Sequence, residues 1–125
     1  MVSSALLVDD DPGYLVLATR ILESMGIETV TTAQDAAAAI AAANATRPEA
    51  VLVDVCLPDR VGIDLAYELA ALPWAPRVVL TSTDSDAVHA IDVRGRPHRI
   101  PFVPKAEVAR SLHRLLTAEA VSGEE

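Results

Sequence analysis

The chain has 125 residues, 51% of them hydrophobic and 22% charged, and its formal net charge is −8. This length and composition predict one globular domain, and the acidic balance argues against nucleic-acid binding by this domain, because phosphate backbones attract Lys and Arg patches. The single cysteine, Cys56, excludes an internal disulfide. The N-terminus lacks secretory signals and no apolar stretch is long enough to span a bilayer, so we expect a cytoplasmic protein without a membrane segment.

The N-terminal segment predicts a strand followed by a helix. The short apolar run Ser4–Val8 is typical of a buried strand, and it ends in three acids, Asp9–Asp11. Pro12 suits the first turn of a helix, because that position needs no backbone N–H. Gly26 suits the C′ position just beyond the end of the same helix.

A second strand and helix are predicted next. The segment Ile27–Thr31 is rich in β-branched residues, which favour strands. Thr32 can cap the following helix, with Asp35 in the capping-box position. Alanines then extend this helix to about Asn44.

The apolar run that begins at Ala50 leads directly into the carboxylate of Asp54. A short run rich in valine is typical of a strand that is buried on both faces, and Pro58 cannot continue its pairing. Asp54 is therefore predicted at the carboxyl end of a central strand, where open parallel sheets place their ligands. The alternative is an ordinary loop or helix-capping aspartate.

The second half of the chain continues the alternation after a turn at Gly62. Its predicted elements are, in chain order, a helix marked by Leu65, Leu69 and Leu72 and ended by Pro73, a strand at Arg77–Thr81, a weaker helix at Ser85–Val93, a basic loop at Arg94–Arg99, a strand at Ile100–Val103, a helix from Val108 to about Ala120, and a polar tail at Val121–Glu125. Pro101 interrupts the fifth strand, which places that strand at a sheet edge.

Five strands alternating with five helices predict a single doubly wound α/β domain over residues 1–120, with a five-stranded parallel sheet. The carboxyl ends of parallel strands lie at one edge. Polar groups from four strands should therefore converge there: Asp9–Asp11, Asp54, Thr81–Thr83 and Lys105.

These groups suit phosphoryl chemistry. Clustered carboxylates of Asp9, Asp10 and Asp54 repel one another and favour a divalent cation, and oxygen ligands suit Mg²⁺. A carboxylate can attack phosphorus to give an acyl phosphate. Lys105 can pair with one phosphoryl oxygen and the Thr81 hydroxyl with another, which would draw the loop after the fourth strand inward.

The chain resembles the receiver domain of bacterial two-component response regulators over essentially its whole length. The matching pieces are the acidic pair in Val8-Asp9-Asp10, Asp54 with Pro58 four and Gly62 eight residues later, Thr81 after an apolar strand, the lysine in Val103-Pro104-Lys105, and Phe102 three residues before that lysine. Their order and spacing make the resemblance specific.

The resemblance implies a flavodoxin-like (βα)5 fold with strand order 2-1-3-4-5. It also implies Mg²⁺-dependent phosphorylation of Asp54 by a sensor histidine kinase or a phosphotransfer protein, and slow loss of the phosphoryl group. The signal would pass through the fourth helix, fifth strand and fifth helix to an attached or separate output partner. Regulation of transcription and the formation of homodimers on phosphorylation are compatible with this resemblance. At most, the chain would catalyse its own phosphorylation and dephosphorylation.

The resemblance also assigns roles to single residues. Asp54 is the phosphoacceptor, assisted by Thr81 and Lys105, and Thr81 and Phe102 form the switch. The implied metal ligands are Asp10, Asp54, the backbone carbonyl of Cys56, and Asp9 through water.

The sequence departs from the family at three places. The family usually has proline after the lysine, joined by a cis bond, whereas Ala106 follows here, so the conformation of the Lys105–Ala106 bond stays open. Ser82 replaces a smaller residue after the threonine, and Arg94–Arg99 differs most from the family pattern. The segment Val103-Pro-Lys-Ala-Glu-Val resembles receivers that are attached to helix-turn-helix domains.

Two other classes use a similar fold. A phosphatase of the haloacid-dehalogenase type also has a strand-end aspartate nucleophile and Mg²⁺, but it needs a second acid two residues later, where this chain has Cys56. A flavodoxin-like cofactor binder needs a phosphate loop after the first strand, and Asp9–Asp11 would repel the phosphate.

Overall fold

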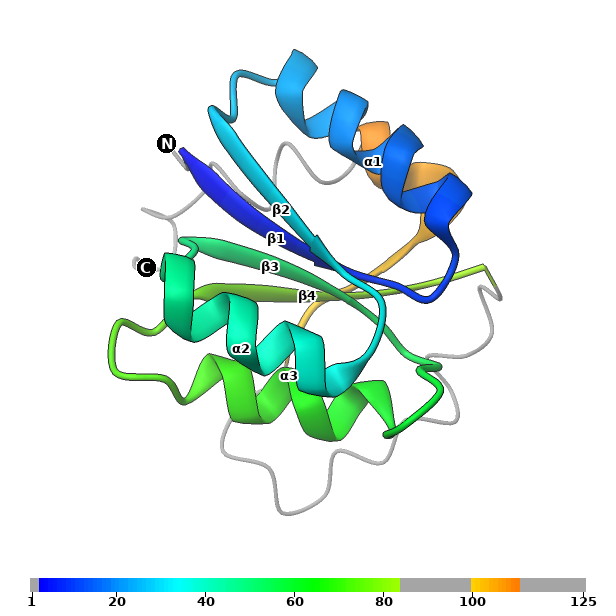
Figure 1. Ribbon diagram of the computed structural model, residues 1–125. Coiled ribbons are helices and arrows are strands. Elements are labelled where there is room, and N and C mark those ends of the chain that lie inside the picture. Colours follow the sequence, from blue (N-terminus) through cyan, green and yellow to red (C-terminus); the bar gives the residue numbers. More distant parts are fainter. Residues whose placement is uncertain (1–2, 84–99, 111–125) are drawn as a thin grey trace, which may run out of the picture.

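The computed structural model describes residues 3–83 and 100–110. Five parallel strands form one sheet in the order β2-β1-β3-β4-β5 (Figure 1). The strands are β1 (Ser4–Val8), β2 (Thr29–Ala33), β3 (Ala50–Asp54), β4 (Arg77–Ser82) and β5 (Phe102–Pro104). The predicted flavodoxin-like α/β fold and its strand order 2-1-3-4-5 are confirmed.

Helices lie on both faces of the sheet. Helix α1 (Pro12–Ser24) covers one face, and α2 (Ala36–Thr46) and α3 (Gly62–Ala70) lie side by side on the other (Figure 1). Because successive strand residues point to opposite faces, Leu52 of β3 packs in the core on the α1 side, whereas Val53 packs in the core beneath α2 and α3. All residues of β3 are buried, as expected for the central strand of a parallel sheet.

The ends of α1 follow the predicted signals. Asp11 is the N-cap, and its carboxylate accepts a hydrogen bond from the backbone N–H of Gly13 at 2.9 Å. The helix ends at Ser24, and Gly26 has a φ of 95°, a left-handed conformation that a glycine adopts without strain. The prediction that Gly26 terminates this helix is confirmed.

The second strand and the cap that follows it differ from the prediction. β2 covers Thr29–Ala33 instead of Ile27–Thr31, because Thr32 pairs with Leu7 of β1 and so continues the strand. Thr32 therefore does not cap α2. Asp35 is the N-cap, and its side chain accepts from the N–H of Ala38 at 2.7 Å.

Two further boundaries also differ. α3 ends at Ala70, so Leu72 lies beyond the helix, although its side chain still packs against the core. β5 begins at Phe102, which leaves Pro101 outside the strand, where its carbonyl accepts from the N–H of Leu80 at 2.8 Å. The predicted edge position of β5 is confirmed.

The remaining predicted elements lie outside the described residues. They are the helix at Ser85–Val93, the basic loop at Arg94–Arg99 and the polar tail at Val121–Glu125. A 3₁₀ turn at Lys105–Glu107 follows β5, and residues 108–110 begin the last predicted helix. No helix within residues 3–83 and 100–110 combines the length and the apolar character needed to cross a bilayer.

Candidate functional site

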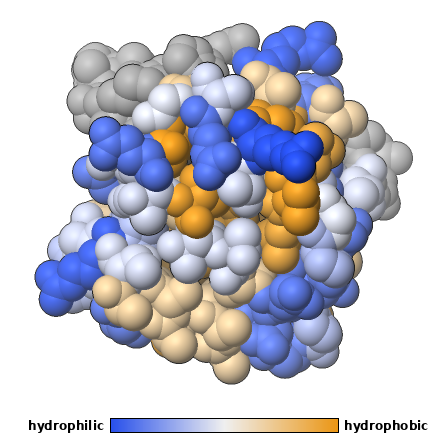
Figure 2. All heavy atoms as spheres, turned by 45° about the horizontal axis from the view of Figure 1, so that its top comes forward, coloured by the Kyte–Doolittle hydropathy of each residue, from blue (hydrophilic) through white to orange (hydrophobic). Residues whose placement is uncertain are grey.

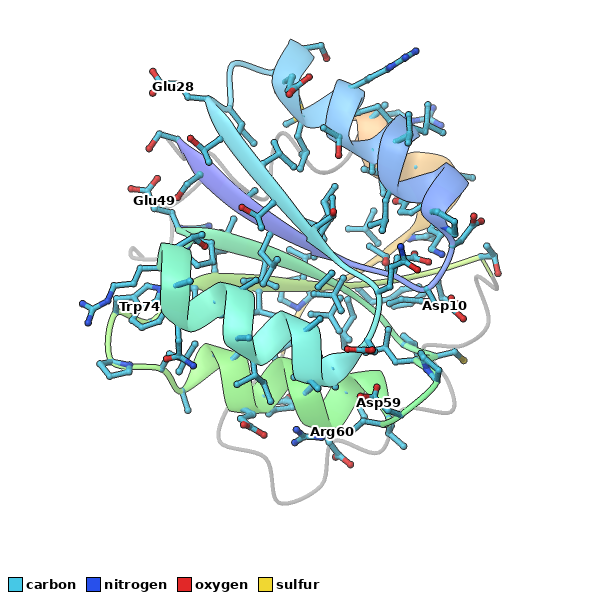
Figure 3. The ribbon with its side chains drawn as sticks, viewed as in Figure 1. Asp10, Glu28, Glu49, Asp59, Arg60 and Trp74 are labelled. Carbon is cyan, nitrogen blue, oxygen red and sulfur yellow. The ribbon has the colours of Figure 1, made fainter. Side chains whose placement is uncertain are left out.

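Three carboxylates gather at the carboxyl edge of the sheet. Asp9 directly follows β1, Asp10 comes next, and Asp54 is the last residue of β3. One carboxylate oxygen from each lies within 4.8 Å of the others. Asp9 and Asp54 are buried, with 2% and 7% exposure, whereas Asp10 is exposed at the loop after β1 (Figure 3). The predicted acid cluster is therefore present, with one member open to solvent.

Strand register places Thr81 beside Asp54. The two residues are partners in the pairing of β3 with β4. Leu52 and Val79, two positions earlier in the same strands, both belong to the core on the α1 side, so Asp54 and Thr81 point to that same side. Thr81 is 2% exposed, and its backbone oxygen accepts from the N–H of Val55 at 2.9 Å.

Lys105 reaches the acids from the end of β5. Its Nζ forms an ion pair with Oδ2 of Asp9 and lies 3.8 Å from Oδ2 of Asp54. The Lys105 side chain is only 10% exposed, so the ammonium is largely removed from bulk water. The peptide bond between Lys105 and Ala106 is trans. Residues from four strand ends, far apart in sequence, thus meet in one place.

Burial and the charges of neighbouring residues disfavour the ionised form of Asp54. Burial raises the pKa of Asp54 to about 6, and the charge of Asp9 adds to this effect. The ammonium of Lys105 and a hydrogen bond from the backbone N–H of Cys56 offset part of the increase. The cluster therefore carries negative charge that Lys105 does not fully neutralise, and its oxygen-only donor set suits a hard divalent cation.

Cys56 and Phe102 are the two remaining residues with predicted roles, in metal ligation and in the switch respectively. Cys56 is exposed in the loop after β3. Phe102 lies in β5 opposite Leu80 and packs, partly buried, against the core beneath α2 and α3. The carbonyl ligation by Cys56 and the switch role of Phe102 stay predictions.

The loop that carries Asp54 into α3 is closely packed. The N–H of Gly62 donates to the carbonyl of Val55 at 2.8 Å. A Cβ atom at Gly62 would lie 2.0 Å from the carbonyl oxygen of Asp54, so the backbone passes too close for any side chain. The predicted turn residue is in fact the first residue of α3, and its requirement for glycine comes from this close approach.

Tyr14 also contributes to the site, although its role was not predicted from the sequence. The Nζ of Lys105 lies over the ring of Tyr14, 4.4 Å from the ring centroid. Burial raises the pKa of Tyr14 to about 12, with further contributions from the charges of Asp9 and Asp54, so its hydroxyl stays protonated at neutral pH. Its aromatic character in the first turn of the helix after the acids was the only available signal.

The contact of Asp59 with the start of α2 was also not predicted from the sequence. Its carboxylate accepts from the backbone N–H groups of Ala36 at 2.9 Å and Ala37 at 3.2 Å, which start α2. Figure 3 shows Asp59 beside the first turn of α2, although it belongs to the loop before α3. The hydrogen bond from Ala36 is the main reason that the pKa of Asp59 is lowered. No local sequence pattern reveals a cap that comes from a distant loop.

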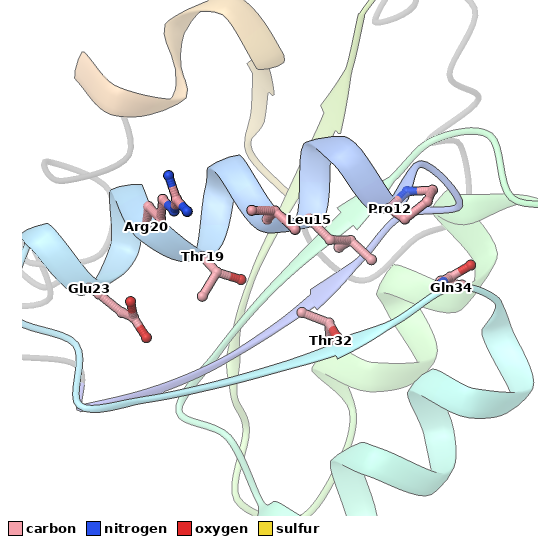
Figure 4. Close-up of a pocket in the computed structure, with 8 residues that line it drawn as sticks. Pro12, Leu15, Thr19, Arg20, Glu23, Thr32 and Gln34 are labelled. Carbon is pink, nitrogen blue, oxygen red and sulfur yellow. The ribbon is translucent and has the colours of Figure 1, made fainter.

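A separate groove lies between α1 and β2 (Figure 4). Its volume is about 410 Å³, and it is lined by Pro12, Leu15, Val16, Thr19, Arg20, Glu23, Thr32 and Gln34. The same helix exposes Val16 and Leu17 by 56% and 55%, and Figure 2 shows apolar atoms among hydrophilic ones on this side of the molecule. None of the predicted phosphorylation-site residues lines this groove.

Comparison with known proteins agrees with this geometry. Residues 5–116 match the model of the response regulator receiver domain family. The chain is 34% identical to the probable transcriptional regulatory protein TcrX of Mycobacterium tuberculosis, over 95% of this chain and 52% of that protein. It is 37% identical to the DNA-binding response regulator MtrA of Mycolicibacterium smegmatis, over 88% of this chain and 49% of that protein.

The fold has close structural counterparts. A response regulator receiver domain protein of Clostridium thermocellum superimposes with a TM-score of 0.79 at 18% identity, covering 97% of this chain and 96% of the other. This likeness concerns the fold alone. The chain spans about half the length of the curated relatives that it matches.

Proposed function

The chain belongs to the response regulator receiver domain family, and on this premise we propose that it is the phosphoacceptor switch of a two-component system, with Asp54 as the acceptor. One observation carries the proposal. The largely buried ammonium of Lys105 is paired with Asp9 and lies 3.8 Å from Asp54, in a cluster of three carboxylates. A cation held beside a strand-end carboxylate suits the capture of a phosphoryl group.

Asp54 acts as the nucleophile. A carboxylate oxygen of Asp54 forms a bond to phosphorus while the bond between phosphorus and the donor breaks, and the donor keeps that electron pair. A pKa of about 6 leaves Asp54 mainly ionised at neutral pH, as a nucleophile must be. Lys105 pairs with one phosphoryl oxygen, and the hydroxyl of Thr81, on the same side of the sheet, pairs with another.

The acid cluster fits a magnesium ion by its chemistry, since three carboxylates within 4.8 Å of one another need a cation to offset their repulsion. We assign Asp10 and Asp54 as direct ligands, together with the backbone carbonyl of Cys56, and Asp9 as a ligand through water. When bound, Mg²⁺ supplies positive charge that reduces the repulsion between these acids and the oxygens of the phosphodonor.

The partners follow from the family and from the surface. The phosphodonor is a histidine kinase or a phosphotransfer protein of the cytoplasm. The exposed apolar residues Val16 and Leu17 lie on the helix that begins beside the acids, and exposed apolar groups next to a reactive site suit a docking protein. The output is an attached or separate partner that binds the surface around β5. The similarity to the transcriptional regulatory protein TcrX and the DNA-binding response regulator MtrA supports a role in transcription.

Intact-mass measurement tests the acceptor. We expect acetyl phosphate with Mg²⁺ to add the mass of one phosphoryl group to the chain, and chelation of Mg²⁺ to prevent the addition. Asp54→Asn should abolish it, whereas Asp11→Asn, which changes an acid that caps α1, should not. Phosphorylation that persists in Asp54→Asn would refute the assignment.

The same reaction separates the switch from a phosphatase. A receiver holds its phosphoryl group and releases phosphate slowly. A haloacid-dehalogenase-type enzyme would instead release many equivalents of phosphate from the donor without accumulating phosphoprotein, and that result would favour the enzyme.

A further inference from the structure

The aromatic ring of Tyr14 forms one wall around the Lys105 ammonium. The Nζ of Lys105 lies 4.4 Å from the ring centroid, and the same atom pairs with Asp9 and lies 3.8 Å from Asp54. The ammonium therefore has an aromatic face on one side and two carboxylates on others. Such a contact between a cation and an aromatic ring is attractive, and more so when both groups are removed from water.

The backbone holds the ring in this position. Tyr14 lies in the first turn of α1, and the carboxylate of Asp11 accepts hydrogen bonds from the N–H groups of Gly13 at 2.9 Å and Tyr14 at 3.4 Å. The following residue, Leu15, is buried in the core on this side of the sheet. The start of the helix, and with it the backbone of Tyr14, is thus held by contacts that do not involve Lys105.

The hydroxyl of Tyr14 has a different environment from the ring. It is buried, and it forms no hydrogen bond with any of the described residues. A buried hydroxyl without a partner lowers stability, and phenylalanine would avoid that cost. The part of Tyr14 that meets a functional group is therefore its aromatic face, which a phenylalanine would preserve and a leucine would not.

We propose that Tyr14 is a positioning residue for Lys105, and that its ring face holds the ammonium where it meets the incoming phosphoryl group. This inference rests on the proposed function, because it refines the role of Lys105 in the same site. A lysine side chain has four rotatable bonds, and the attraction of Asp9 alone would leave its ammonium on that one carboxylate. The ring supplies a second contact that keeps the ammonium within reach of Asp54.

Phosphorylation kinetics test the role of the ring. With acetyl phosphate and saturating Mg²⁺, we expect Tyr14→Leu to be phosphorylated about fivefold more slowly, the equivalent of about 1 kcal/mol for a cation–aromatic contact. Tyr14→Phe should restore the rate to within about twofold of the unmodified protein. The second tyrosine of the chain, Tyr67, lies in α3 on the opposite face of the sheet. Tyr67→Leu therefore controls for a general loss of packing, and it should leave the phosphorylation rate unchanged.

A double-mutant cycle in unfolding tests the contact itself, independently of phosphorylation. Tyr14→Leu, Lys105→Met and the double variant are compared by urea denaturation of the metal-free protein. We expect the loss in the folding equilibrium constant caused by Tyr14→Leu to be about fivefold smaller when Lys105 has already been replaced by methionine. Tyr14→Phe should be at least as stable as the unmodified protein, because it removes a buried hydroxyl that has no hydrogen-bond partner among the described residues.

The outcomes are distinguishable. An unchanged phosphorylation rate in Tyr14→Leu, an equal slowing in Tyr14→Phe, or the absence of coupling with Lys105 would each overturn the role of the ring while leaving the phosphoacceptor in place. An unmodified chain that accepts no phosphoryl group would instead refute the proposed function, and the unfolding cycle would still decide whether Tyr14 holds Lys105.

Discussion

Replacing Asp54 with asparagine should make the metal-free protein more stable at neutral pH. Asp54 is buried at the end of β3, and its ionised form is disfavoured first by burial and then by the charge of Asp9. Asparagine has almost the same shape, and its carbonyl oxygen can still accept a hydrogen bond. The substitution therefore removes a charge that the folded state holds at a cost, and the unfolded state loses nothing comparable.

The magnitude follows from the pKa. The interval between the ordinary value of 3.8 and the value of about 6 in the folded protein corresponds to about 3 kcal/mol, at about 1.36 kcal/mol per pH unit. We expect a gain of about 1 to 3 kcal/mol, because water and counter-ions screen part of the repulsion at the sheet edge. For a domain of this size, such a gain raises the midpoint of thermal unfolding by several degrees.

The sign of the pH dependence is fixed by the direction of this shift. The folded protein binds the Asp54 proton more tightly than the unfolded chain, so stability falls as the pH rises from about 3.8 to about 6. Asp54→Asn has no carboxyl group at this position, so its stability does not fall for this reason as the pH rises. The difference in stability between the variant and the unmodified protein should therefore be small near pH 4 and reach its full value above pH 6.

Urea denaturation in the presence of a chelator measures this difference. Both proteins are unfolded at a series of pH values, and subtraction of the two profiles removes the contribution of acids that are distant from the site. A variant that is no more stable than the unmodified protein at pH 7.5, or a difference that does not change with pH, would refute the electrostatic account of the site.

Three further results are expected. Gly62→Ala should lower the free energy of unfolding by about 2 kcal/mol or more in urea denaturation, because its Cβ would lie 2.0 Å from the Asp54 carbonyl oxygen; wild-type stability would contradict this contact. Asp59→Ala should lower the thermal midpoint at neutral pH, because it removes a hydrogen-bond acceptor from the start of α2. The comparison is the N-cap variant Asp35→Ala, which should lower the free energy of unfolding by about 1 kcal/mol. An unchanged midpoint in Asp59→Ala would show that Asp59 does not stabilise α2. Millimolar Mg²⁺ should raise the thermal midpoint of the unmodified protein, and raise it less in Asp10→Asn; equal shifts would place the ion elsewhere.

The sheet and the convergence of its strand ends could be predicted because both depend on local patterns. The run that ends at Asp54 is too short for a helix and too apolar for a loop, and the structure buries it completely. Once the strands are known to be parallel, their carboxyl ends must share an edge, whatever the details of the helices. The meeting of Asp54 with Lys105 follows from topology rather than from any precise boundary.

What could not be predicted depends on contacts between segments that are distant in sequence. Thr32 is chemically suited both to a strand and to a helix cap, and its pairing with Leu7 of β1 decides the outcome. Asp59 looks like an ordinary residue of a turn after proline until α2 is placed beside it. Tyr14 could be any helical residue until β5 brings Lys105 over its ring.

The connections of Asp54 favour one direction for the signal. The loop after it is joined to β4 by the hydrogen bond from Val55 to Thr81, and Lys105 approaches from the end of β5. A phosphoryl group on Asp54 adds negative charge, and among the described residues the Lys105 ammonium and the Thr81 hydroxyl are nearby groups that can pair with it. Both belong to the β4–β5 side of the sheet, so their response moves that side rather than β2. On the opposite flank Asp59 offers only a further carboxylate, already engaged with α2, which a new negative charge does not attract. We therefore expect the change of surface to arise around β5, the edge strand of the sheet.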